Sequence, residues 1–404
     1  MAEALRALPA ARIVAHVADA ARRWRDADLP PRVRVTAEIK RRLGYSTPVV
    51  DFALDRLFSG IDRDALESAI AAELGAVRAL DGPLERQGLP PAWARGVERV
   101  AIVSSDTTIG VALVPAIFAL CAKCDVTVKD RSDALVAAFF ASLAEEHPAF
   151  ARSALARPWT GGDDPHEAEL FRTADVVVAF GGDEALRAIR ERCGAETRFV
   201  PFGHRASIGR LTGADAAALD GALADRIVSD ALLYDGEGCL SLHALFVDAG
   251  GTELERVANV LRTAGERVAL EFPGGARDAA AVARTAAYRN LAEFRAASGS
   301  GAVLRARDAM LVIEPPAADG PPFLPRVLPV YAGDDDAVAS YVARLRLPVQ
   351  ALGVVACDAN SVALAARIGA VRVAPFGAMQ SPPVAGHHGG RPRIADFIRW
   401  IDGA

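Results

Sequence analysis

The sequence predicts an α/β protein built on parallel sheets and divided into more than one domain. From residue 97 onward, short apolar runs of strand length alternate with longer runs of helical periodicity, a pattern typical of parallel strands joined by helices. The strand-like runs are strongly apolar, which indicates sheets covered on both faces. The length of 404 residues exceeds what one hydrophobic core normally supports, so we expect at least two domains.

Composition limits the class of protein and of partner. Hydrophobic residues make up 51% and charged residues 24% of the chain, an ordinary balance for a globular protein. The net charge is −5, and basic residues form no tract, so nucleic acid is not an expected partner. Five cysteines are too few and too scattered for a disulfide framework, and their odd number leaves a free thiol.

We expect neither a secretory signal nor a membrane span. Glu3, Arg6 and Arg12 place charges where a secretory signal would be apolar. The longest apolar run, 109–122, is too short to cross a bilayer. These features predict a cytoplasmic protein in a reducing compartment.

Residues 1–96 are expected to form a helical N-terminal region. Apolar residues recur at helical spacing in 3–25 and again in 63–78, where Asp62 is the expected N-cap. No residue pattern of chemical interest occurs here, so packing or assembly is the expected role.

The next segment, 97–225, alternates between strands and helices. Its expected strands are 97–103, 125–129, 174–180 and 198–200, and its expected helices are 109–123, 133–146 and one that begins at Asp183.

A second alternating series occupies 226–375. Its expected strands are 243–248, 309–313, 327–331, 352–356 and 370–374, and its expected helices are 252–266, 277–297, 335–346 and 359–368. The last segment, 376–404, begins in a loop rich in Pro, Gly and His, and we expect it to end in an amphipathic helix over 394–401.

The most reactive candidate in the sequence is Cys239. Gly236 and Gly238 allow a sharp turn that would present the thiol at the start of an apolar strand. A thiol surrounded by free backbone N–H groups is a plausible nucleophile, whereas a buried, inert cysteine is the ordinary alternative.

Two loops follow predicted strands at the edge where open α/β sheets bind ligands. At Gly181 and Gly182, which precede Asp183, a phosphate could approach the N-terminus of the next helix, although a bare Gly-Gly also fits a structural turn. The run Lys129-Asp130-Arg131-Ser132-Asp133 could hold a nucleotide ribose and its 2′-phosphate, with a solvated loop as the alternative.

No metal site is expected. Cys121 and Cys124 form a C-x-x-C pair inside an apolar helix without a second pair, which favours buried packing residues. His387 and His388 lack a partner at metal-ligand spacing.

Several short motifs occur in an order that resembles the aldehyde dehydrogenase superfamily, and most closely the acyl-CoA reductase family typified by the fatty-acid reductase component of bacterial bioluminescence. The resemblance is clear from about residue 98 to 402 and looser from about 50. The motifs are Gly238-Cys239-Leu240-Ser241, Phe376-Gly377-Ala378-Met379-Gln380-Ser381-Pro382-Pro383, His387-His388-Gly389-Gly390 and Arg399-Trp400-Ile401-Asp402.

The resemblance implies an aldehyde-dehydrogenase-like fold with a Rossmann-type cofactor domain at 97–225 and an α/β catalytic cysteine domain at 226–375. It implies that segment 376–404 returns to the cofactor domain or to an oligomer interface, and that the protein is a homo-oligomer.

Functional residues follow from the same resemblance. Cys239 matches the nucleophile, and Lys129 matches the lysine that contacts the adenosine ribose of the cofactor. Gly182 and Asp183 match the start of the phosphate-facing helix. Phe323, in Phe323-Leu324-Pro325, resembles a degenerate form of the turn that abuts the nicotinamide ribose.

Two positions depart from the pattern of hydrolytic aldehyde dehydrogenases. The glutamate that activates the deacylating water falls on Pro201, which cannot act as a base, so an acyl-enzyme would await a thiol or a hydride. The oxyanion-binding asparagine falls on Asp106, and an ionised aspartate would repel an oxyanion. Either Asp106 is protonated, or Thr107 or Thr108 donates instead, or catalysis has been lost.

The resemblance implies NAD(P)H-dependent reduction of an acyl-CoA, or another acyl thioester, to an aldehyde through a thioester on Cys239. Arg131 favours NADPH because it offers a partner for a 2′-phosphate, whereas Asp133 would favour NADH. Catalytic help from His243 is a lesser expectation, because a strand residue at this position is expected to point elsewhere.

Three alternatives remain open at this stage. An acylating aldehyde dehydrogenase would run the same reaction in reverse, and a thiol acyltransferase would use the same cysteine without reduction. A catalytically silent member of the family, serving as a partner-binding subunit, would explain why position 106 holds an aspartate. An acyl-transferring partner protein is left open as well.

Overall fold

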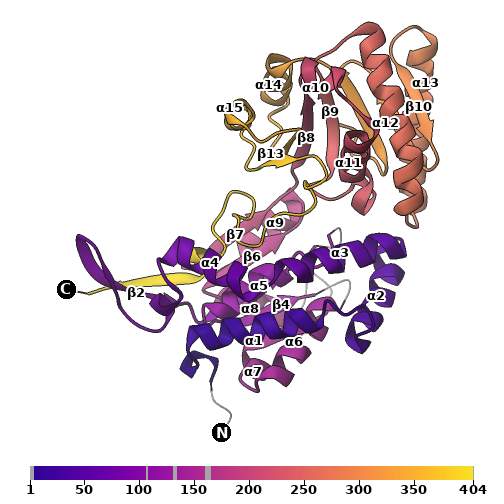
Figure 1. The fold of residues 1–404 in the computed structure, drawn as a ribbon. Coiled ribbons are helices and arrows are strands. Elements are labelled where there is room, and N and C mark those ends of the chain that lie inside the picture. The colour runs from indigo at the N-terminus through magenta and orange to yellow at the C-terminus, as the bar shows by residue number, and fades with distance from the viewer. Residues whose placement is uncertain (1–3, 106–107, 131–133, 160–164, 404) are drawn as a thin grey trace. The chain divides into compact units, whose positions relative to one another are not determined.

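The computed structural model describes residues 4–105, 108–130, 134–159 and 165–403, without the side chains of residues 165 and 166. By packing, the chain divides into two compact units. The first unit comprises Met1–Leu43, Val50–Gly203 and Pro383–Ala404, and the second comprises Gly44–Val49 and His204–Pro382. Figure 1 shows the elements of both units.

The first unit contains a five-stranded parallel sheet whose order is β5-β4-β3-β6-β7. The chain starts in the middle, builds β4 and β5 on one side and then returns to add β6 and β7 on the other. In this sheet the reversal lies between β3 and β6. Open parallel sheets commonly bind ligands at such a reversal. The strands are β3 (Arg99–Val103), β4 (Asp125–Lys129), β5 (Ala154–Arg157), β6 (Val176–Phe180) and β7 (Arg198–Phe202).

The helices of this unit follow the predicted periodicity. In α1, the buried residues recur at intervals of three and four, as an amphipathic helix requires. Asp62 caps α4 as predicted, because its side chain accepts a hydrogen bond from the Ala65 N–H at 2.8 Å. The helices are α1 (Ala10–Arg23), α2 (Pro30–Leu43), α3 (Thr47–Gly60), α4 (Arg63–Leu74), α5 (Leu113–Cys121), α6 (Leu135–Glu146), α7 (Phe150–Ser153), α8 (Pro165–Thr173) and α9 (Asp183–Arg192), with 3-10 turns η1 (Leu5–Ala7) and η2 (Val77–Leu80).

The predicted C-terminal helix over 394–401 is wrong. The structure has a 3-10 turn η4 (Ala395–Phe397) followed by strand β15 (Ile398–Asp402), which pairs antiparallel with β2 (Leu89–Gly96) (Figure 1). The buried residues of this segment do have helical spacing, but pairing with an otherwise open strand edge satisfies the backbone instead. Tertiary structure therefore overrides the local pattern.

A short hairpin also interrupts the region predicted to be helical. β1 (Leu84–Arg86) pairs with β2 across a two-residue turn in which Gly88 has a φ of 72°. Two-residue hairpin turns need positive φ and therefore favour glycine, so the Gln87-Gly88 pair in the sequence indicates this hairpin.

The second unit contains a seven-stranded sheet whose order is β10-β11-β12-β9-β8-β13-β14. Its pairings are parallel except for the β10–β11 hairpin at one edge. The strands are β8 (Ala206–Leu211), β9 (Leu242–Val247), β10 (Ala302–Ala306), β11 (Ala309–Ile313), β12 (Val327–Ala332), β13 (Val349–Val354) and β14 (Val373–Pro375).

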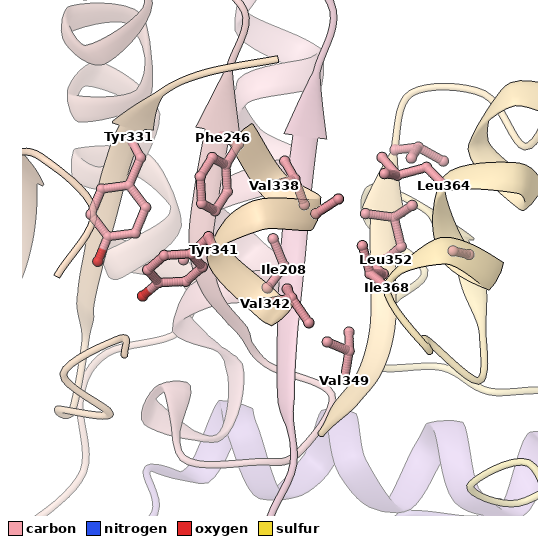
Figure 2. Packing of buried hydrophobic residues seen from close by; sticks show 14 residues of the cluster. Ile208, Phe246, Tyr331, Val338, Tyr341, Val342, Val349, Leu352, Leu364 and Ile368 are labelled. Atoms are coloured by element: carbon pink, nitrogen blue, oxygen red, sulfur yellow. The ribbon is translucent and has the colours of Figure 1, made fainter. Parts of the chain in front are cut away.

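Helices α14 and α15 pack on this sheet through one buried cluster, which Figure 2 shows. Phe246 of β9 lies at the centre of an aromatic group, with ring centroids 5.2 Å from Tyr331 and 5.4 Å from Tyr341. Each fully buried side chain of this size contributes about 1.5–3 kcal/mol to folding. The helices of the unit are α10 (Gly213–Ala217), α11 (Gly221–Leu232), α12 (Gly251–Glu271), α13 (Ala279–Ala297), α14 (Asp335–Leu345) and α15 (Ala359–Arg367), with the 3-10 turn η3 (Leu233–Gly236).

The structure confirms the α/β fold class with parallel sheets and N-terminal helices. Strands β5, β8 and β10 and helices α7, α8, α10 and α11 were not predicted from the sequence. In the described part of the chain, none of the helices has the length and apolar character that a membrane crossing requires.

Candidate active site

The predicted nucleophile Cys239 lies in the second unit on a tight turn over residues 234–241, which includes most of η3 and ends at β9. Three consecutive residues of this turn have left-handed backbone angles, with φ of 53° at Tyr234, 57° at Asp235 and 76° at Gly236. A side chain at position 236 would meet the Ala231 carbonyl oxygen at 2.9 Å, so only glycine fits there. Non-glycine residues in this region cost about 1–2 kcal/mol each, so other contacts must hold the turn in place.

Buried ion pairs supply those contacts. The Asp235 carboxylate lies 2.8 Å from the Arg277 guanidinium and 3.3 Å from that of Arg326. The backbone N–H of Arg326 also donates to the backbone carbonyl of Asp235 at 2.8 Å. Asp235 and Arg326 are each 2% exposed, and removing one partner of such a buried pair costs about 3–5 kcal/mol. The backbone of the turn is therefore rigidly held.

The Cys239 thiol is accessible and faces backbone donors. The residue is exposed, although neighbouring groups crowd the sulfur, and this partial burial raises its pKa. Three groups act against this effect and lower the pKa of the thiol: the backbone N–H groups of Cys239 and Leu240 and the positive charge of Arg205. The Ser207 hydroxyl donates to the Cys239 carbonyl at 2.8 Å and fixes the peptide that follows the nucleophile. This arrangement can stabilise a thiolate or an oxyanion.

The other cysteines have different environments. Cys121 and Cys124 are fully buried, and desolvation raises the pKa of Cys121 to about 12. Cys357 is exposed, like Cys239. Among the described residues, groups of three or more His, Cys, Asp and Glu side chains suited to a metal ion do not occur.

His243 lies on β9 as a neutral, buried ring. Its Nδ1 accepts a hydrogen bond from the Ser207 N–H at 3.0 Å, and burial lowers its pKa to about 4. The Phe323 ring, which the resemblance implies to lie near the nicotinamide ribose, has its centroid 5.0 Å from that of His243. Phe323 itself is 49% exposed and has a φ of 46°. Residues 323 and 243 are thus brought together, although 80 positions separate them in the sequence.

In the first unit, the predicted phosphate site forms the joint between β6 and α9. Gly182 is the N-cap of α9, and Asp183 is its first residue. A Cβ at Gly181 would meet the Ala185 Cβ at 3.5 Å, an ordinary van der Waals contact, so packing does not require glycine at this position. The free N–H groups of the first helical turn favour an anion there, whereas the Asp183 and Glu184 carboxylates oppose it.

Lys129, the predicted ribose contact, ends β4 and is 4% exposed. Its ammonium group lies 2.7 Å from the Glu167 carboxylate of α8. That carboxylate also accepts from the Trp159 indole N–H and lies 3.2 Å from the Arg192 guanidinium. An acidic side chain at the end of the second strand of a Rossmann sheet ordinarily binds a ribose diol. Glu167 comes from α8 instead, and its ion pair with Lys129 brings its carboxylate next to the end of β4.

Four predicted site residues lie outside the described residues: Asp106 and Thr107 of the expected oxyanion site, and Arg131 and Ser132 of the expected cofactor loop.

Several residues at these sites could not be predicted from the sequence. Glu167 lies 38 positions from Lys129, and Ser207 lies 32 positions from Cys239. Gln380 is hydrogen-bonded to Ser241 across 139 positions. Contacts of this length depend on strand order, which a single sequence does not reveal.

Structural comparisons agree on the fold. A putative aldehyde dehydrogenase from Burkholderia cenocepacia is 16% identical with a TM-score of 0.71, and the match covers 99% of this chain and 88% of that one. Aldehyde dehydrogenase 21 from Physcomitrella patens, solved with the product succinate, is 12% identical with a TM-score of 0.73 over 98% of this chain and 86% of that one. These likenesses establish an aldehyde-dehydrogenase-like fold.

Sequence comparisons identify the family. A "Long-chain acyl-protein thioester reductase" of Aliivibrio fischeri is 24% identical over 260 residues, which cover 59% of this chain and 52% of the relative. The matched region therefore spans about half of that relative. The family model described as "Acyl-CoA reductase (LuxC)" matches residues 5–400. The chain therefore belongs to the acyl-CoA reductase (LuxC) family.

Proposed function

We propose that this protein is an acyl thioester reductase that converts an acyl-CoA to an aldehyde through a thioester on Cys239. The observation that carries the proposal is the accessible Cys239 thiol, held on a rigid turn whose N–H groups face the sulfur. The family description names acyl-CoA, and the name of the Aliivibrio fischeri relative adds acyl-protein thioesters. Both are thioesters, so the same attack applies to either.

In the proposed mechanism, the Cys239 thiolate attacks the thioester carbonyl, and the Cys239 N–H donates to the developing oxyanion. A second donor is assigned to Thr107 or Thr108, with Asp106 protonated where it contributes. The substrate thiol leaves with its electron pair and takes up a proton, and the acyl group remains on Cys239. Pro201 carries no ionisable group at the position where hydrolytic relatives have their base, so the acyl-enzyme is not committed to hydrolysis.

A nicotinamide cofactor fits the first unit. Gly181 and Gly182, at the N-terminus of α9, would hold its pyrophosphate, and Lys129, with the Glu167 carboxylate beside it, would contact its adenosine ribose. When bound, the cofactor supplies the hydride that takes the acyl group to the aldehyde level. Arg131 favours NADPH, whereas the Glu167 carboxylate favours the free diol of NADH, so both belong in the test.

The test is incubation with a panel of acyl-CoAs and acyl-protein thioesters without cofactor, followed by intact mass spectrometry. The wild type is compared with Cys239→Ala and with Cys357→Ala, which removes the other exposed thiol. We expect an acyl adduct on the wild type and on Cys357→Ala and none on Cys239→Ala. An adduct that persists in Cys239→Ala would overturn the proposal.

The cofactor step is tested by adding NADPH or NADH to the isolated adduct. Release of aldehyde supports the reductase. Transfer of the acyl group to an added thiol, without reduction by either nucleotide, would instead identify a thiol acyltransferase.

A further inference from the structure

We propose that Gln380 is a positioning residue for Cys239, which fixes the turn that carries the nucleophile through a buried hydrogen-bond bridge. This inference rests on the proposed role of Cys239. Gln380 is 8% exposed and lies in the loop after β14, far from Cys239 in the sequence.

The Gln380 carboxamide joins two elements on either side of it. Its Nε2 donates to the Ser241 hydroxyl at 2.9 Å and to the Asp230 carbonyl of α11 at 3.1 Å, and both bonds are buried. An amide nitrogen has two hydrogens, so both are used. The carboxamide thus ties the nucleophile turn to the end of a long helix.

Ser241 passes this constraint to Cys239. The Ser241 N–H donates to the Gly238 carbonyl at 2.8 Å and closes the turn around the cysteine. A Cβ at Gly238 would lie 3.2 Å from the Ser241 oxygen and 3.9 Å from Gln380 Oε1, so the carboxamide lies directly behind the turn. Displacing Ser241 would therefore rotate the peptides whose N–H groups face the sulfur.

The loop that carries Gln380 is itself fixed. The Gly377 N–H donates to the buried Asp230 carboxylate at 2.6 Å. Arg372 donates to the Ala378 carbonyl at 2.8 Å and to the Met379 carbonyl at 2.6 Å. Gln380 can therefore act as a rigid support, because Asp230 and Arg372 hold the backbone immediately before it, at residues 377–379.

A glutamine is the side chain that this position requires. Leucine has a similar size but cannot donate, and an ionised glutamate presents only acceptors, which leaves the Asp230 carbonyl without a donor. An unpaired buried acceptor is costly, so either change would shift the turn.

The experiment measures the reactivity of the Cys239 thiol in the full chain, independently of any thioester. Gln380→Leu, Ser241→Ala and the double variant are alkylated with iodoacetamide over a range of pH, and peptide mass spectrometry assigns the label to Cys239. Met379→Leu is the matched control, because it changes packing in the same loop without removing the bridge. Thermal unfolding is measured on every variant.

We expect Gln380→Leu to raise the apparent pKa of the Cys239 thiol and to slow its alkylation at neutral pH about ten-fold, since a shift of one pKa unit is a ten-fold change in thiolate. Ser241→Ala should do the same, and the double variant should be no worse than either single change. Acyl transfer from a thioester should fall through kcat with little change in KM.

Unchanged alkylation in Gln380→Leu, or an equal change in Met379→Leu, would overturn the proposal. If Gln380→Leu fails to fold, Ser241→Ala decides the question, because it keeps the bond between Gln380 and Asp230. The alkylation rates could respond as expected while no thioester acylates the protein. That result would support the positioning role of Gln380 and refute the proposed function.

Discussion

At the scale of single residues, the catalytic proposal depends on how the surroundings of a few groups differ. Cys239 and Cys121 are the same residue type, yet one thiol is exposed beside N–H donors and the other is fully buried. Composition predicted a free thiol, and the flanking glycines indicated which cysteine would be presented on a turn. The donors that support it, Ser207 and Gln380, come from distant positions and were not predictable.

Asp230 predicts a dependence of stability on pH. Burial raises its pKa from 3.8 to about 7. The unfolded chain loses this proton near pH 4 and the folded protein near pH 7, so the folded state binds more protons between these values. The free energy of unfolding should therefore fall as pH rises from 4 to 7, by up to about 4 kcal/mol from this group.

Asp230→Asn should remove this fall in the free energy of unfolding between pH 4 and 7. Denaturant unfolding at several pH values measures the effect. Asp225→Asn, at a partly exposed carboxylate on the same helix that pairs with Arg267, is the control. Identical pH slopes in the wild type and in Asp230→Asn would contradict the assignment.

Glu167 predicts the choice of coenzyme. If the adenosine ribose binds beside Lys129, the Glu167 carboxylate would accept from a free diol and repel a 2′-phosphate. Glu167→Gln should therefore raise kcat/KM with NADPH relative to NADH by about ten-fold, a change on the order of 1.4 kcal/mol. Glu169→Gln, an exposed residue on the same helix, is the control. A ratio unchanged by Glu167→Gln would locate the ribose elsewhere.

At the scale of elements, the turn over 234–241 is the feature that the sequence predicted in outline and the structure supplies in detail. Glycines at 236 and 238 indicated a sharp bend before an apolar strand. The left-handed angles at Tyr234 and Asp235 carried no such signal, because they depend on Arg277 and Arg326 from other elements.

Gly236→Ala tests how closely the turn is constrained. Alanine at a φ of 76° is strained, and its Cβ would meet the Ala231 carbonyl at 2.9 Å. We expect a loss of about 2–3 kcal/mol in the free energy of unfolding together with slower alkylation of Cys239. Gly82→Ala, where a Cβ meets nothing within 4 Å, should be close to neutral. Equal stability of the two variants would show that the turn can relax.

The predicted elements succeeded where the pattern was local and failed where pairing was distant. Strand β4 matches its predicted bounds, and α9 begins at Asp183 as expected. Residues 394–401 have helical spacing but form a 3-10 turn and a strand, because β2 offers them an edge. The same limit explains why β8 was not predicted, although it lies beside the strand that follows Cys239.

At the scale of the whole molecule, the order of motifs along the chain predicted the family, and the comparisons confirm it from residue 5 to 400. The first unit contains a sheet with a Rossmann-like strand order, and the second contains the turn that carries Cys239. The acyl chain and the coenzyme depend on side-chain surroundings, which motif order does not encode.

The central claim is that an acyl group on Cys239 is reduced to an aldehyde. The most direct measurement isolates the acylated enzyme, adds NADPH or NADH in a single turnover, and counts nucleotide oxidised, aldehyde released and acyl-cysteine lost. We expect the three amounts to be equal. Release of free acid without oxidation of the nucleotide, or an acyl-cysteine stable to both coenzymes, would contradict it.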